Sequence, residues 1–341
     1  RAQVIVCNAG NANACTGEQG RRGAEAMADT VAAALKISPE DVIVASTGLI
    51  GEVFPTEDVV AGIKETVPKL SNDAKAGSFL ANAILTTDTF AKEGFVDFEW
   101  EGKTISIGGV AKGSGMIHPN MATMLSFLAT DIDIDEKLLQ KTLKYCVERS
   151  FNMITVDGDT STNDMVAILA NGMAGNKKIT QEDDPLYVIF KEKLAELLIH
   201  LAKLIVSDGE GASKFIEYRV SKAISENVAM KLIRAISDST LVKTAMFGRD
   251  PNWGRIIAAC GNAGISFNYK KANLYLGDAD NQVQVLLKGS PTKFDKNYMK
   301  KLLRESHIKV HLELNTGKQE ATGWGSDLTT DYVMFNSVYT T

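Results

Sequence analysis

The sequence predicts an α/β protein, built either as two α/β units or as one large layered unit with excursions. The chain has 341 residues, more than the roughly 250–300 at which a single hydrophobic core stops growing. Hydrophobic residues make up 45% of the chain and charged residues 23%, the ordinary balance of a globular protein with a large core. Short apolar runs alternate with segments whose apolar residues recur at the three- or four-residue spacing of an α-helix.

The first 149 residues alternate between strand and helix patterns. An apolar run at residues 3–6 predicts a strand, and residues 16–36 predict a helix with Thr16 as its N-cap. Strand patterns at 95–100 and 104–110 are separated by a short turn, which indicates a hairpin. The other elements expected here are strands at 41–46 and 124–129 and helices at 56–67, 71–85 and 135–149.

The same alternation continues through the second half of the chain. Residues 186–206 form the longest helical pattern, which the glycine-containing turn at 208–211 ends. The other expected elements are strands at 166–170, 215–220 and 241–247, helices at 227–237 and 252–259, further strands, a helix near 295–305 and a β-rich tail.

Charge and hydropathy argue against a nucleic-acid partner and against a membrane-spanning helix. The formal net charge is −5, and 37 basic residues are spread among 42 acidic ones, so the sequence offers no basic stripe for a nucleic-acid backbone. The most apolar helical pattern, 194–206, contains Glu196, His200 and Lys203 and falls short of the roughly 18 uncharged residues of a membrane span. We therefore expect neither a nucleic-acid partner nor a span.

Cysteine spacing bears on metal binding and on compartment. The four cysteines are far apart in the sequence, at Cys7, Cys15, Cys146 and Cys260. Since zinc sites and redox motifs use close pairs, we expect reduced thiols and a cytoplasmic protein. The chain begins at Arg1 with a strand pattern close behind it, so we expect a missing upstream segment rather than a signal peptide.

Two polar loops resemble ligand sites but depart from the patterns that those sites need. In the glycine-rich segment 108–115, the order from residue 112 is Lys-Gly-Ser and not the Gly-Lys-Ser/Thr of a phosphate loop, so we reject nucleotide binding. Segment 157–164 has oxygen side chains at calcium-loop spacing. However, its sixth position is Thr162 rather than glycine and its twelfth is Ile168 rather than glutamate. We expect a polar turn or a site-lining loop there.

Several single residues keep two interpretations. Lys112, between apolar strand residues and a glycine loop, either extends into solvent or meets an anionic substrate. Glu210 either faces water or is functional. His118 lies four residues before Ala122 and either bonds the backbone there or holds a turn. His200 shares a helical stripe with charged residues and is expected in solvent, so a Ser/His/Asp triad has no obvious carrier.

Distinctive segments occur in order along nearly the whole chain, at residues 8–17, 46–51, 112–123, 157–164, 249–255 and 336–341. Together they resemble the ornithine acetyltransferase family, also called glutamate N-acetyltransferases, whose members cut themselves. The resemblance implies an α/β fold in which mixed sheets and helices form a layered sandwich, as in self-processing aminopeptidases. Family members usually carry an additional segment ahead of the strand expected at 3–6.

The resemblance also implies the site. The chain would be cut between Ala122 and Thr123, and the newly exposed Thr123 would carry the acetyl group. Thr47 and Gly48 match the family's oxyanion-hole positions. The positions that hold the amino-acid substrate match Thr86, Lys112, Thr123, Glu210, Asn336 and Thr341.

On this basis we expect a catalytic α/β unit over 1–215, which contains the junction between segments 1–122 and 123–341. A second α/β unit over 216–341 would return its tail to the site. The implied activity is ping-pong transfer of acetyl from N2-acetylornithine to glutamate in arginine biosynthesis, without metal or prosthetic group. Whether acetyl-CoA is a second donor stays open. Processed segments would pair, and the pairs would assemble as a heterotetramer.

Two alternatives remain at this stage. An aminopeptidase or amidase of related self-cleaving architecture would use water instead of glutamate as acceptor. A non-catalytic amino-acid-binding protein would never cut itself.

An N-terminal threonine carries a nucleophile and a base on one residue. Before cleavage, the Thr123 hydroxyl can attack the Ala122 carbonyl through a five-membered ring, and water can then cleave the resulting ester. Afterwards the new α-amino group, whose usual pKa is about 7.7–8.0, can take the hydroxyl proton. A neighbouring Lys112 charge would lower that pKa and increase the fraction of free base.

Overall fold

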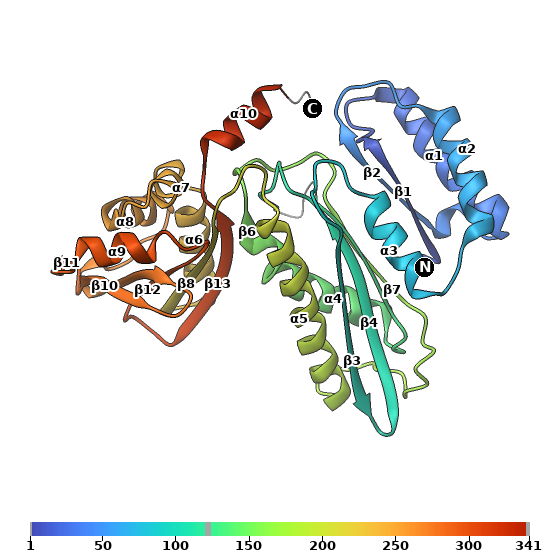
Figure 1. Ribbon diagram of the computed structural model, residues 1–341. Helices are drawn as coiled ribbons and strands as arrows, with labels where there is room; N and C mark the ends of the chain where they lie inside the picture. The colour runs from blue at the N-terminus through green and yellow to red at the C-terminus, as the bar shows by residue number, and fades with distance from the viewer. Residues whose placement is uncertain (1, 120–123, 339–341) are drawn as a thin grey trace.

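The computed structural model describes residues 2–119 and 124–338. Within these residues the strands form three sheets, of two, four and seven strands, with helices packed against them (Figure 1). The predicted α/β class and its layering of mixed sheets and helices are therefore confirmed. Across the same residues no helix combines the length and the apolarity needed to cross a membrane.

The first layer is a parallel pair of strands covered by helices. The elements are β1 (Val4–Asn11), β2 (Val42–Leu49), α1 (Gly17–Leu35) and α2 (Thr56–Thr66), with short 3-10 helices at Pro39–Asp41 and Val67–Lys69. Met27, Val31, Phe54 and Ile63 form a small core between the helices and the strands. Register runs from Val4 opposite Val42 to Gly10 opposite Gly48, so both strands end at the same edge.

The second layer is a mixed four-stranded sheet in the order β3-β4-β5-β7. Its elements are β3 (Lys92–Trp100), β4 (Lys103–Lys112), β5 (Leu125–Thr130) and β7 (Met165–Ala170), with α3 (Ala74–Ala83), α4 (Glu136–Glu148) and α5 (Pro185–Ser207). Ala81 of α3 and Ala45 of β2 pack with Val110 and Phe127, which joins this sheet to the first layer. Strands β4 and β5 pair antiparallel, with Lys112 opposite Leu125.

The third layer is a seven-stranded sheet in the order β11-β10-β9-β12-β8-β13-β6. Its strands are β6 (Ile154–Thr155), β8 (Phe215–Ala223), β9 (Asn273–Asp278), β10 (Gln282–Leu287), β11 (Ser290–Pro291), β12 (His307–Glu313) and β13 (Gln319–Ser326). The helices are α6 (Glu226–Ser237), α7 (Thr240–Phe247), α8 (Trp253–Gly261), α9 (Lys296–Leu302) and α10 (Thr330–Val338), with 3-10 turns at Phe151–Met153 and Tyr269–Lys271.

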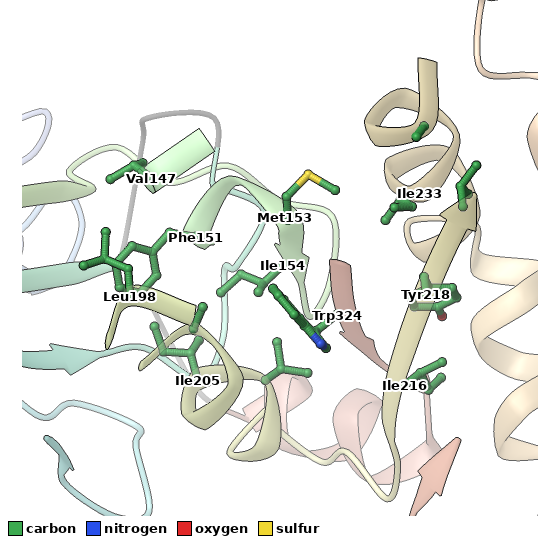
Figure 2. Close-up of a cluster of buried hydrophobic side chains, with 14 of the residues drawn as sticks. Val147, Phe151, Met153, Ile154, Leu198, Ile205, Ile216, Tyr218, Ile233 and Trp324 are labelled. Atoms are coloured by element: carbon green, nitrogen blue, oxygen red, sulfur yellow. The ribbon is translucent and has the colours of Figure 1, made fainter. Parts of the chain in front are cut away.

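The largest core joins the second and third layers. Figure 2 shows Ile205 of α5 beside Ile154 of β6 and Trp324 of β13, all within one buried cluster. On the other side of the same cluster, Tyr218 of β8 lies near Ile233 of α6. Helix α5 confirms the expected long helix at 186–206, and it contributes to this cluster along most of its length.

Most elements form where the sequence predicts them, but three expectations are wrong in whole or in part. The expected strand at 241–247 is helix α7. Ser239 caps it by accepting the Val242 amide, and Val242, Ala245 and Met246 are buried at helical spacing. The β-rich tail is correct for β12 and β13 but ends in helix α10. Thr16 precedes α1 as predicted, but its hydroxyl donates to Asn13 rather than capping the helix.

The proposed boundary between 215 and 216 stays a prediction. Strand β8 begins at Phe215, directly at this boundary. However, β6 precedes the boundary in the sequence and β13 follows it. The two strands pair in parallel, with Ile154 opposite Trp324. The seven-stranded sheet is therefore built from both sides of the proposed division.

Candidate active site

A cavity of about 230 Å³ is lined by all the predicted site residues that lie in the described ranges. They come from five separate places in the chain: the end of β2, the loop after α3, the end of β4, the connection from α5 to β8, and α10. The residues are Thr47, Gly48, Thr86, Lys112, Glu210 and Asn336. In Figure 1, α10 extends from the third layer toward the end of β2. Ala122, Thr123 and Thr341 lie outside the described residues.

Parallel pairing with β1 determines the conformation at Gly48. Its φ is +130°, and a Cβ placed there would lie 2.3 Å from the Gly10 carbonyl carbon and 2.6 Å from the Asn11 amide nitrogen. Only glycine fits this backbone approach. The adjoining Thr47 is buried, and its hydroxyl oxygen accepts a hydrogen bond from the Lys112 ammonium at 3.2 Å. Its own hydroxyl proton can therefore be donated elsewhere.

Gly48→Ala is expected to lower the free energy of unfolding by about 1–3 kcal/mol through backbone strain alone, and to reduce any transfer that depends on the Gly48 amide. Chemical denaturation and a transfer assay measure the two effects. Gly62→Ala is the matched control, because Gly62 lies within α2, has no positive φ and has open space at its Cβ position. That change is expected to stabilise the protein by about 0.5–1 kcal/mol. Equal unfolding midpoints for both variants would contradict the account.

Lys112 is buried at the end of β4 and directed at the cavity. Its ammonium donates to Thr86 Oγ1 at 2.7 Å and to Thr47 Oγ1 at 3.2 Å, and lies 3.7 Å from an oxygen of Asp88. Burial lowers the pKa of Lys112, and Asp88 opposes this effect. The alternative of a solvent-exposed lysine is thus wrong.

Glu210 is half-buried and lines the cavity. Its amide donates to the Ser114 carbonyl at 2.9 Å, and its carboxylate accepts from Asn336 Nδ2 at 3.1 Å. A Cβ on Gly115 would lie 2.2 Å from a Glu210 oxygen, so the glycine at this position lets the carboxylate approach the loop after β4. Helix α10 thereby reaches the site through Asn336.

The loop at 157–164 lines the cavity, as one of its two interpretations predicts. The Asp157 carboxylate accepts the amides of Met116 and Ile117 at 2.7 and 2.9 Å, and burial raises the pKa of Asp157. Asp159 and Asn163 also line the cavity. The loop therefore fastens the segment after Lys112 to the third layer by carboxylate-to-amide bonds.

Asp164, at the end of this loop, accepts a hydrogen bond from the Met124 amide. Burial raises its pKa to about 7, so near neutral pH this group is only partly ionised. Met124 is the first described residue after the expected junction. The position of Asp164 beside it could not be read from a motif.

Sequence reasoning missed two polar residues around the cavity, which are Asp88 and Tyr332. Asp88 contacts Lys112 from the loop after α3. Tyr332 lines the cavity from α10, and burial raises its pKa. No local pattern indicated Asp88. The expected β-rich tail gave no indication of helix α10, which carries Tyr332.

The histidines lie apart from the cavity lining. His118 Nδ1 is 3.3 Å from Asp238 Oδ1, and the His118 carbonyl accepts from the Thr160 hydroxyl at 2.8 Å. These contacts favour the turn-holding interpretation of His118. His200 is exposed, as predicted.

A larger cavity, of about 720 Å³, lies between β1, α3 and the four-stranded sheet. Its lining is mostly apolar, with residues such as Ile5, Leu80 and Phe127, and Glu93 is its acidic group. Acyl transfer needs hydrogen-bond donors and ionisable groups at the reacting atoms. The chemistry of the lining therefore favours the smaller cavity as the functional site.

Comparison with known proteins gives consistent matches over the whole chain. The sequence model of the ArgJ family matches residues 1–341. A protein of Symbiobacterium thermophilum named arginine biosynthesis bifunctional protein ArgJ is 50% identical over 339 residues, which cover 99% of this chain and 83% of that protein. A protein of the same name from Caldanaerobacter subterraneus subsp. tengcongensis is 49% identical over 341 residues, covering 100% and 84%.

One solved structure also resembles this fold. The crystal structure of arginine biosynthesis bifunctional protein ArgJ from Bacillus halodurans matches with a TM-score of 0.58 at 40% sequence identity. The match covers 62% of this chain and 98% of that one.

Proposed function

Because this chain belongs to the ArgJ family, we propose that it is a self-processing acetyltransferase of arginine biosynthesis. It transfers the acetyl group of N2-acetylornithine to glutamate. The observation that carries the proposal is the convergence of Thr47, Gly48, Thr86, Lys112, Glu210 and Asn336 on one cavity. The five chain segments that supply them are distant in sequence, so their meeting supports a common site.

In the first step the precursor cuts itself. The Thr123 hydroxyl attacks the Ala122 carbonyl carbon, the C–N bond breaks, and an ester links Ala122 to the Thr123 oxygen. Water then hydrolyses the ester, which leaves a carboxylate on Ala122 and a free amine and hydroxyl on Thr123. No external protease takes part.

In the second step Thr123 takes the acetyl group. Its α-amine accepts the hydroxyl proton while the oxygen attacks the acetyl carbonyl of N2-acetylornithine. The Thr47 hydroxyl and the Gly48 amide donate to the developing oxyanion, a role whose loss typically costs roughly 10²–10³ in turnover. The α-nitrogen of ornithine takes the proton and leaves.

In the third step the α-amine of glutamate attacks the acetyl-Thr123 ester, and the Thr123 oxygen recovers its proton. Both substrates carry an α-carboxylate, so one cation can anchor each of them in turn. Lys112 suits this role because its ammonium is buried at the cavity and already oriented by Thr86. Glu210 and Asn336, which hydrogen-bond each other, orient the α-nitrogen.

The chain supplies nucleophile, base and oxyanion donors itself, so the proposed cycle uses no metal or prosthetic group. Segments 1–122 and 123–341 would stay paired through β4 and β5, and the family resemblance favours two such pairs as a heterotetramer. The free cysteines Cys7, Cys15, Cys146 and Cys260 support a cytoplasmic location.

A donor panel tests the proposal. Purified protein is incubated with glutamate and either N2-acetylornithine or acetyl-CoA, and N-acetylglutamate is measured by mass spectrometry. We expect transfer from N2-acetylornithine, and transfer from acetyl-CoA would add the second donor. Acetate release that does not need glutamate would instead indicate an amidase. Absence of product from both donors would overturn the proposal.

A further inference from the structure

Four charged side chains form a buried row behind the cavity, in the order Asp208, Lys92, Asp88 and Lys112. Lys92 Nζ lies 2.6 Å from Asp208 Oδ2 and 2.7 Å from Asp88 Oδ1, and Lys112 Nζ lies 3.7 Å from Asp88 Oδ2. The Lys92 and Asp88 side chains are 0% exposed, and those of Lys112 and Asp208 are 3% exposed. Two cations and two anions are thus enclosed together away from solvent.

Asp88 is the member of this row that touches the site. Its Oδ1 accepts the Gly113 amide at 2.6 Å as well as the Lys92 ammonium. Its Oδ2 accepts the Thr86 amide at 3.3 Å and faces Lys112. One carboxylate therefore holds both the loop that carries Thr86 and the end of the strand that carries Lys112.

From this geometry we infer that Asp88 is a positioning residue. It holds the Lys112 ammonium between Thr47 and Thr86 and supplies the negative charge that offsets the burial of that ammonium. The inference rests on the proposed function, in which Lys112 anchors the substrate α-carboxylate. Lys92 and Asp208 complete the row and keep Asp88 in place.

The charge balance at Lys112 follows from the groups that face it. Burial disfavours its ammonium form, Asp88 favours it, and Lys92 disfavours it. The Cys7 thiol on β1 faces it from the first layer, and Asp164 faces it from the loop at 157–164. Asp88 is the nearest of the carboxylates and the one whose pKa is lowered, despite burial, by Lys112 and Lys92. It is therefore the anion that stays charged across neutral pH.

These contacts determine how anchoring of the substrate α-carboxylate by Lys112 depends on pH. Carboxylate anchoring needs protonated Lys112, so it is lost as the pH rises through the pKa of Lys112. Asp88→Asn removes the nearest anion and lowers that pKa further, which moves the alkaline limb of kcat/KM to lower pH. An opposite charge at this range typically shifts a pKa by about 1–3 units. Lys92→Met removes a like charge and moves the limb to higher pH.

The experiment compares pH profiles of kcat/KM for the wild-type protein, Asp88→Asn and Lys92→Met. Opposite shifts of the alkaline limb are expected, and at pH values above the limb KM should rise about tenfold for each unit by which Asp88→Asn lowers the pKa of Lys112. Asp327→Asn is the matched control. Asp327 is also a buried carboxylate that accepts backbone amides, those of Ser213 and Lys214 at 2.8 and 2.9 Å, but it does not contact Lys112. Asp327→Asn should therefore leave the alkaline limb of kcat/KM unchanged.

A second measurement needs no activity. Trace labelling with acetic anhydride across a pH series, followed by mass spectrometry of the Lys112 peptide, gives the pKa of Lys112 directly. If the wild-type protein transfers no acetyl group, the proposed function fails, while shifts of opposite sign in this titration still support the role of Asp88. If Asp88→Asn does not fold, Lys92→Met alone must raise the Lys112 pKa. Profiles and titrations that coincide for wild type, Asp88→Asn and Lys92→Met would overturn the inference.

Discussion

Thr123→Ala is expected to yield a protein that stays uncut and transfers acetyl at a rate reduced by at least about 10⁴-fold, because a residue that serves as both nucleophile and base has no substitute. On a denaturing gel we expect the variant to run as one band of full length and the wild-type protein to separate into segments 1–122 and 123–341. Intact mass and a coupled assay for N-acetylglutamate measure both effects.

Thr123→Ser is the matched variant for this prediction. Serine keeps the hydroxyl and the α-amine, so cleavage continues and transfer falls far less than in the alanine variant. Full transfer by uncut Thr123→Ala would refute the self-cleaving mechanism. Cleavage that persists in the alanine variant would instead indicate an external protease.

Lys112→Met is the second change with a large expected effect. It removes the charge-assisted hydrogen bond that we propose between Lys112 and the substrate α-carboxylate. Such a bond is worth about 1.5–3 kcal/mol or about 10- to 150-fold in affinity. Because ornithine and glutamate derivatives share this carboxylate, the KM of both substrates should rise together. Steady-state kinetics with each substrate varied in turn measures the effect.

The fold should survive Lys112→Met, since Asp88 keeps its ion pair with Lys92 and its bond from the Gly113 amide. Lys141→Met serves as control, because Lys141 is an exposed lysine paired with Glu182 on the surface, and it should leave both KM values unchanged. A rise in KM for only one substrate would contradict a shared anchor at Lys112.

Much of the fold is predictable from local patterns, and the misassigned run at 241–247 shows where such patterns fail. The helix at 186–206 was recognisable because it is long and strongly periodic. The run at 241–247 is short and apolar, and its pattern fits the period of a strand as well as that of a helix. Only its packing therefore decides which of the two it forms. In the structure Ser239 caps it and one face is buried, which makes it helical.

The site was partly predictable for a different reason. Residues such as Thr47, Lys112 and Asn336 lie in distinctive segments, so a family pattern could find them before any geometry was known. The roles of Asp88 and Asp164 depend on burial and on neighbours far away in the chain. Nothing in the local sequence distinguishes Asp88 from a carboxylate that faces water, whereas Asp164 lies in the distinctive segment 157–164.

The antiparallel pairing of β4 with β5 spans the expected junction, from Ile107 opposite Thr130 to Lys112 opposite Leu125. A cut before Thr123 leaves one of these strands on each product, so the break removes chain connectivity without removing the ladder. Refolding from denaturant should therefore have a different kinetic order in the cut protein than in the uncut precursor. An uncut precursor regains its structure in a first-order reaction, whereas the two halves of a matured molecule must find each other, and their recovery accelerates with concentration.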